Sequence, residues 1–186
     1  MNLPNQLTLG RLVLCGVFTL LLALETSWSG LAALVVFVVA SLTDWLDGHL
    51  ARKWNLITDL GKLLDPLADK ILISAAFIGM VAAGLAPFWI VVCIIAREFL
   101  ITGLRTLAAS KGIVLAAERL GKHKTISQMV TAHVGLIHLA LGGMGWWPQL
   151  SEWMNAWILP PLLYLTLLIT LYSGASYFIK NKRLLF

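Results

Sequence analysis

Long apolar segments alternate with short polar ones along the whole chain. They run from about Thr8 to Leu24, Leu31 to Arg52, Lys62 to Ala83, Pro87 to Ala109, Thr125 to Trp147 and Ile158 to Ile179. Each is near the roughly 20 residues that an α-helix needs to cross a bilayer. Because no strand-like alternation appears, a transmembrane β-barrel is disfavoured. The pattern predicts an all-α, polytopic membrane protein with six transmembrane helices.

Composition supports this class. Of the 186 residues, 59% are hydrophobic and only 12% are charged, about half the charged share of a soluble domain. A water-soluble globule and a disordered chain are therefore both disfavoured. The length suits one domain spanning residues 1–186. Cys15 and Cys93 lie within apolar segments and are expected to be core residues rather than a disulfide.

The basic residues predict the orientation. The candidate outer loops, Glu25–Gly30, the turn at Gly84 and Gly142–Trp157, contain no Lys or Arg. The opposite connections and the tail carry Arg52, Lys53, Lys111, Arg119, Lys122, Lys124, Lys180, Lys182 and Arg183. Basic residues mark the cytoplasmic side, so both termini are expected in the cytoplasm. The net charge of +5 then reflects topology, and no nucleic-acid partner is expected.

Four acidic residues flank the turn between the second and third segments. Asp44 and Asp47 are three positions apart, and Asp65 and Asp69 are four apart, so each pair shares one helical face. An antiparallel helical hairpin would bring the pairs level. Four carboxylates in a low-dielectric site need protonation or hard cations such as Mg²⁺ or Mn²⁺.

Structural roles are the alternative for these acids. Asp65 precedes Pro66 and fits a helix N-cap. Asp44 and Asp47 also fit ion pairs with Arg52 and Lys53 at the membrane interface. A cluster of four acids within spans nevertheless favours a functional site.

The segment from Asp44 to Asp69 resembles the signature of the CDP-alcohol phosphotransferase family, D-x2-D-G-x2-A-R-x8-G-x3-D-x3-D. Every specified residue and every gap matches. The resemblance implies two Mg²⁺ (or Mn²⁺) ions per site, the first held by Asp44, Asp47 and Asp65, and the second by Asp44, Asp65 and Asp69. It also implies that Asp69 is the catalytic base. The residues that the family uses to contact the cytidine diphosphate correspond to Gly48, Ala51, Arg52 and Gly61.

Further segments resemble the bacterial members of the family that form phosphatidylglycerol phosphate. They are Leu3–Arg11, Arg97–Arg105 and Gly121–Thr125. The resemblance implies transfer of the phosphatidyl group of CDP-diacylglycerol to glycerol 3-phosphate, with release of CMP. It also implies a homodimer among the lipids of a bacterial inner membrane, with the active site facing the cytoplasm.

An acceptor that carries a phosphate requires cationic partners. Arg97 and Arg105 lie about 80° apart around one helix, and Lys122 and Lys124 approach from the same end of the bundle. Salt bridges and topology signals are the alternative roles of these residues. Asn5, Arg11 and Thr125 are further candidate site residues, and Arg11 also fits a contact with a lipid headgroup.

Other functions remain open at this point. A different acceptor, such as an inositol phosphate or serine, fits the same family. A divalent-cation transporter would also need acids within spans, although the inverted repeats typical of transporters are not visible. A purely structural membrane scaffold would not need the acidic cluster.

Overall fold

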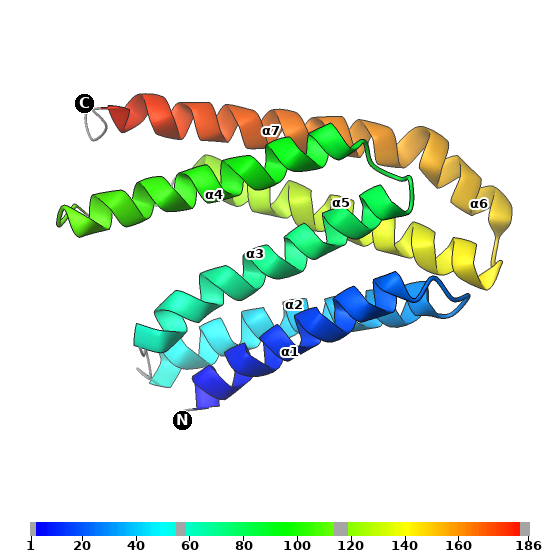
Figure 1. Ribbon diagram of the computed structural model, residues 1–186, viewed down its shortest axis with the longest axis horizontal. Coiled ribbons are helices and arrows are strands. Elements are labelled where there is room, and N and C mark those ends of the chain that lie inside the picture. The colour runs from blue at the N-terminus through cyan, green and yellow to red at the C-terminus, as the bar shows by residue number, and fades with distance from the viewer. Residues whose placement is uncertain (1–2, 55–58, 114–118, 183–186) are drawn as a thin grey trace.

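The computed structural model describes residues 3–54, 59–113 and 119–182, with side chains omitted for 3–7, 45–54, 59–63, 65, 66, 119 and 120. Over these residues the chain is all-α (Figure 1). The helices are α1 (Leu3–Ala23), α2 (Ser29–Trp54), α3 (Asp59–Ala82), α4 (Phe88–Ser110), α5 (Arg119–Met144), α6 (Pro148–Trp153), a π-helical segment (Met154–Ile158) and α7 (Leu159–Lys180).

The helices form one elongated bundle in which the chain runs back and forth. Figure 1 shows the described ends of the chain at the same end of the bundle as the last turns of α2 and α4 and the first turn of α3. The other end carries the α1–α2, α3–α4 and α5–α6 connections. α1 packs against α2 and α3, while α5 contacts α2, α3 and α7 and so joins the two halves. The end with the termini is the one that carries the predicted basic connections.

Apolar side chains fill the centre and also cover the outside. Phe18, Phe37, Phe77 and Met80 are fully buried where the helices meet. Facing outward, the large apolar side chains of Leu20, Phe88, Leu168 and Ile179 are between 64% and 69% exposed. Soluble proteins rarely expose apolar surface on this scale, whereas lipid tails accept it.

Polar side chains are buried between α5 and α7. Thr131 and Thr166 are joined by a hydrogen bond of 2.8 Å between their hydroxyl oxygens, and both are essentially inaccessible to solvent. Contacts of this kind between apolar helices are typical of membrane bundles. They fix how α5 and α7 face each other next to the site described below.

Glycine ends two of the helices. At Gly84 after α3 and Gly145 after α5 the backbone adopts φ of +72° and +65°. The residue after each glycine donates its N–H to a carbonyl five positions back, Leu85 to Met80 and Trp146 to Leu141. Only glycine adopts this left-handed conformation without strain. The predicted turn at Gly84 is confirmed.

The expected loop from Gly142 to Trp157 is wrong. α5 continues to Met144, and Pro148 starts α6, which runs without interruption through the π-helical segment into α7. Proline is favoured in the first turn of a helix because it lacks the N–H that would be left without a partner there. Trp147, with a left-handed backbone (φ +48°), reverses the chain just before it.

Two further boundaries differ from the expectation. α1 begins at Leu3 rather than Thr8, and α5 begins at Arg119 rather than Thr125. Lys122 and Lys124 therefore project from the first turns of a helix. The predicted boundaries of the second, third and fourth segments agree with α2, α3 and α4 to within a few residues.

Two described helical stretches are long and apolar enough to cross a membrane, Gly121–Met144 and Pro148–Lys180. Thr8–Ala23 and Ser29–Asp44 are apolar but shorter over the residues described. α4 has the length of a span but carries Arg97, Glu98 and Arg105. These three side chains line the cavity described below.

Candidate active site

A cavity of about 520 Å³ lies between α3, α4, α5 and α7, a size typical of small-molecule sites. Its charged lining residues are Asp69, Lys70, Arg97, Glu98, Arg105, Lys122 and Lys124. All four basic residues predicted for an acceptor phosphate therefore line one cavity together with the predicted base. Five cations against two carboxylates leave this lining with an excess of positive charge, which favours an anionic ligand.

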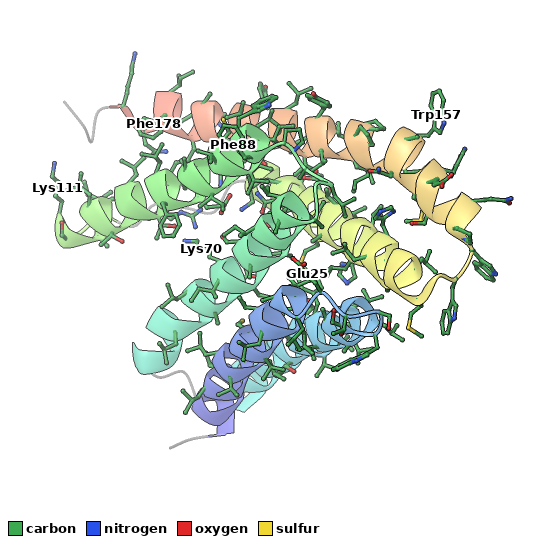
Figure 2. The ribbon with its side chains drawn as sticks, turned by 45° about the vertical axis from the view of Figure 1, so that its right-hand side comes forward. Glu25, Lys70, Phe88, Lys111, Trp157 and Phe178 are labelled. Atoms are coloured by element: carbon green, nitrogen blue, oxygen red, sulfur yellow. The ribbon has the colours of Figure 1, made fainter. Side chains whose placement is uncertain are left out.

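Asp69 and Lys70 come from α3. Asp69 interacts electrostatically with Asp44, Lys124, Arg11 and Glu98, so both acids and bases surround it. The ammonium of Lys70 donates a hydrogen bond to the hydroxyl of Thr102 on α4, and Figure 2 shows Lys70 between α3 and α4. Lys70 was not among the residues singled out from the sequence.

Glu98 on α4 links two of the cations. Its Oε2 accepts a hydrogen bond from Nζ of Lys124 at 2.6 Å, and its Oε1 accepts one from Nη1 of Arg97 at 3.0 Å. Arg97 also donates from Nη2 to the hydroxyl of Ser173 on α7 at 2.7 Å. The two cations are thereby held on adjacent helices.

Arg97 depends on a glycine for its space. A Cβ atom at Gly174 of α7 would lie 2.9 Å from Cγ of Arg97, closer than side-chain carbons normally approach. Gly174 itself is buried. The absence of a side chain at this position lets Arg97 pass α7 and reach Ser173.

Arg105 lies eight residues after Arg97 on α4 and has a different hydrogen-bond partner. Its Nε donates to the hydroxyl of Tyr177 at 3.1 Å. Lys122 is exposed at the cavity edge, while Thr125 lines the cavity and donates its hydroxyl hydrogen to the carbonyl of Gly121 at 3.1 Å. Arg105 and Lys122 are the more accessible cations of the cavity.

Arg11 on α1 is fully buried and forms an ion pair with Asp44 on α2. The structure therefore gives Asp44 a basic partner on a different helix from the proposed Arg52 and Lys53. Arg11 therefore contacts the acidic segment directly. This pair ties α1 to the end of α2 where the signature begins.

The remaining predicted residues lie outside the described side chains. They are Asn5, Asp47, Gly48, Ala51, Arg52, Gly61 and Asp65. Among the described side chains no three His, Cys, Asp or Glu groups meet as a metal site. Asp44 and Asp69, the two described acids of the signature, lie close enough to interact. Their carboxylate oxygens suit a hard divalent cation.

The sequence of the chain matches a known protein family. The family model of the CDP-alcohol phosphatidyltransferases matches residues 1–171. The chain belongs to the CDP-alcohol phosphatidyltransferase family. This match covers α1 to α6 and the first part of α7, and ends just before the cavity residues Ser173 and Tyr177.

Relatives within this family match over nearly their whole length. The chain is 40% identical to the CDP-diacylglycerol–glycerol-3-phosphate 3-phosphatidyltransferase of Bacillus subtilis (strain 168), covering 97% of this chain and 95% of the relative. It is 36% identical to the Escherichia coli (strain K12) protein of that name, covering 95% and 92%. The Rickettsia typhi protein of the same name is 33% identical, with 95% of each chain covered.

The sequence had signals for some of the cavity residues that were missed. Glu98 stands next to Arg97 in an otherwise apolar segment, and a charged pair at that depth needs a polar environment. On α7, Thr166, Thr170 and Ser173 recur at helical spacing. That stripe marks the face that meets α5 and the cavity of this CDP-alcohol phosphatidyltransferase.

Proposed function

We propose that this protein transfers the phosphatidyl group of CDP-diacylglycerol to glycerol 3-phosphate, forming phosphatidylglycerol phosphate and CMP. The observation that carries the proposal is one cavity that combines Asp69 with Arg105, Lys122 and Lys124. The near full-length relatives, whose names specify this donor and this acceptor, support it.

In the proposed reaction the C1 hydroxyl of glycerol 3-phosphate attacks the phosphorus that carries diacylglycerol. The bond from that phosphorus to the oxygen of the CMP phosphate breaks, and CMP leaves. Asp69 accepts the proton of the attacking hydroxyl. Arg105, Lys122 and Lys124 bind the acceptor's own phosphate and so orient its hydroxyl toward the donor.

We propose that Asp44, Asp47, Asp65 and Asp69 hold the Mg²⁺ or Mn²⁺ ions. Bound there, the ions would neutralise the charge of the diphosphate and the charge that develops on the leaving group. Gly48, Ala51, Arg52 and Gly61 are proposed to contact the cytidine diphosphate. The interaction between Asp44 and Asp69 supports a shared site for these acids.

We further propose six spans in a bacterial inner membrane, with both termini and the active site on the cytoplasmic side. The apolar exterior of the bundle supports this placement, as do the basic residues gathered at the end with the termini. A homodimer surrounded by membrane lipids is the assembly that the family resemblance implies. Light scattering on the detergent-solubilised protein would measure the number of chains.

An acceptor panel tests the proposed reaction. Purified protein with Mg²⁺ and CDP-diacylglycerol should release CMP with glycerol 3-phosphate and much more slowly with serine, inositol or inositol phosphate. Faster release with another acceptor would replace glycerol 3-phosphate in the proposal. If no acceptor gives release above the blank, while proteoliposomes pass Mg²⁺ without substrate, the protein is a transporter instead.

A further inference from the structure

Glu98 lines the cavity, and its carboxylate is contacted by basic and polar groups. Its side chain is 12% exposed, and those of Arg97 and Lys124 are 11% and 10% exposed. Lys124 approaches one carboxylate oxygen and Arg97 the other. Each carboxylate oxygen is therefore engaged by one cation.

The two cations need this carboxylate. An ammonium or guanidinium group removed from water is strongly unfavourable unless an opposite charge compensates it. Without Glu98, Lys124 and Arg97 would be two buried cations on adjacent helices that repel each other. They would turn away from the cavity or draw water into the bundle.

Glu98 also belongs to a ring of hydrogen bonds that joins three helices. From Arg97 the ring reaches Ser173, whose hydroxyl donates to the carbonyl of Thr170 at 3.4 Å. The side-chain amide of Gln128 on α5 then donates to the hydroxyl of Thr170 at 3.4 Å and to Oε1 of Glu98 at 3.5 Å. The three contacts of 3.4–3.5 Å are weak, but all five side chains are largely buried. The ring fixes Glu98 relative to α5 and α7.

Lys124 keeps binding capacity while it is held. An ammonium carries three N–H donors, and one donates to Glu98. Lys124 lines the cavity together with Asp69, Arg105 and Lys122, so a ligand bound there can meet its ammonium. The carboxylate thus sets the position of a cation that faces the acceptor.

The basic residues Arg97, Arg105, Lys122 and Lys124 form what is called here the phosphate-binding wall of the cavity. We propose that Glu98 is the positioning residue of this wall: it holds Lys124 and Arg97 in place for the phosphate of the acceptor without contacting the reacting atoms. The proposal rests on the proposed function for the identity of that acceptor. It assigns the specificity for a phosphorylated acceptor partly to an acidic residue.

The test is Glu98→Gln, which keeps the shape of the side chain but removes its charge. Its NH₂ group would also face one of the two cations. The KM for glycerol 3-phosphate and its Kd by calorimetry should both rise about tenfold, because charge-assisted hydrogen bonds orient Lys124 and Arg97. The KM for CDP-diacylglycerol and kcat should change little. Glu98→Asp, which keeps the charge, should lie between Glu98→Gln and the wild type.

A double-mutant cycle with Lys124→Met distinguishes positioning from general structural support. If Glu98 acts mainly through Lys124, adding Glu98→Gln to Lys124→Met should raise the Kd much less than it does alone. Equal effects in both backgrounds would overturn the positioning of Lys124, and an unchanged Kd in folded Glu98→Gln would overturn the whole proposal. Glu152→Gln, an exposed glutamate on α6, is the matched control and should leave the Kd unchanged.

Different results would reject the positioning role of Glu98 and the proposed reaction. Wild-type protein that binds glycerol 3-phosphate but releases no CMP would reject the reaction, while the Kd of Glu98→Gln still tests the positioning role. Inorganic phosphate serves as a second probe of the same wall. Its inhibition constant should rise in the same ratio as the Kd for glycerol 3-phosphate, and an unchanged constant would contradict the role assigned to Glu98.

Discussion

The guanidinium carbon of Arg105 lies 5.3 Å from the centroid of the Tyr177 ring. The Nε of the same guanidinium donates to the Tyr177 hydroxyl. Tyr177 is 3% exposed, whereas Arg105 is exposed to the cavity. A buried aromatic side chain of α7 therefore supports an accessible cation of α4 at the cavity.

Tyr177→Phe should keep the ring under Arg105 and lose the hydrogen bond. Such a bond contributes about 1 kcal/mol, so the KM for glycerol 3-phosphate should rise about fivefold with kcat nearly unchanged. Steady-state kinetics measure this. Tyr172→Phe is the matched control, since Tyr172 is an exposed tyrosine on the same helix. Equal effects of the two substitutions would contradict the support that Tyr177 gives to Arg105.

Arg105→Ala should have a larger effect on the same parameter. Removing a charge-assisted contact to phosphate costs about 1.5–3 kcal/mol, which corresponds to roughly a 10- to 150-fold rise in KM. Arg105→Lys should recover part of the loss because it keeps the charge without the planar fork. An unchanged KM in Arg105→Ala would remove Arg105 from the acceptor site.

Gly174→Ala should displace Arg97, since the added Cβ would meet its Cγ at 2.9 Å. We expect the Kd for glycerol 3-phosphate to rise several-fold as Arg97 leaves Ser173. Gly103→Ala on α4 is the matched control, because a Cβ there meets nothing within 4 Å. That substitution should leave the Kd unchanged. Weakened binding by Gly103→Ala alone would refute the packing argument.

Gly30→Ala should lower stability rather than activity at the site. Its Cβ would lie 2.7 Å from the carbonyl oxygen of Leu139, so α2 and α5 would have to separate. Overpacking of this kind costs about 1–3 kcal/mol, seen as a lower unfolding temperature in detergent. Gly16→Ala on α1, with open space around its Cβ, should not lower that temperature. Equal unfolding temperatures of Gly30→Ala and Gly16→Ala would contradict the close packing of α2 against α5.

The helices were largely predictable because length and hydropathy define them locally. The second, third and fourth segments match α2, α3 and α4 closely. The helix from Pro148 was missed because tryptophan, serine and asparagine around Trp153 resemble an interfacial loop. Whether such a segment is helical depends on Pro148 in its first turn and on packing against α5, and neither appears in a hydropathy pattern.

The site was predictable where a motif or a charge stands out, and not where partners come from separate helices. Arg97, Arg105, Lys122 and Lys124 were chosen because cations within or beside spans are unusual, and they do line one cavity. Their partners were not found, since nothing in the chain order says that Tyr177 faces Arg105. The roles of the signature acids remain predictions.

The measurement that tests the central claim most directly is the conversion of labelled glycerol 3-phosphate to a lipid product by the wild type and by Asp69→Asn. General-base removal lowers rates by about 10²–10⁴. We predict that the wild type forms labelled phosphatidylglycerol phosphate with equimolar CMP. Folded Asp69→Asn should form it at least about a hundredfold more slowly. Equal rates of labelled product in the two proteins would contradict Asp69 as the base, and no labelled lipid from the wild type would contradict the proposed reaction itself.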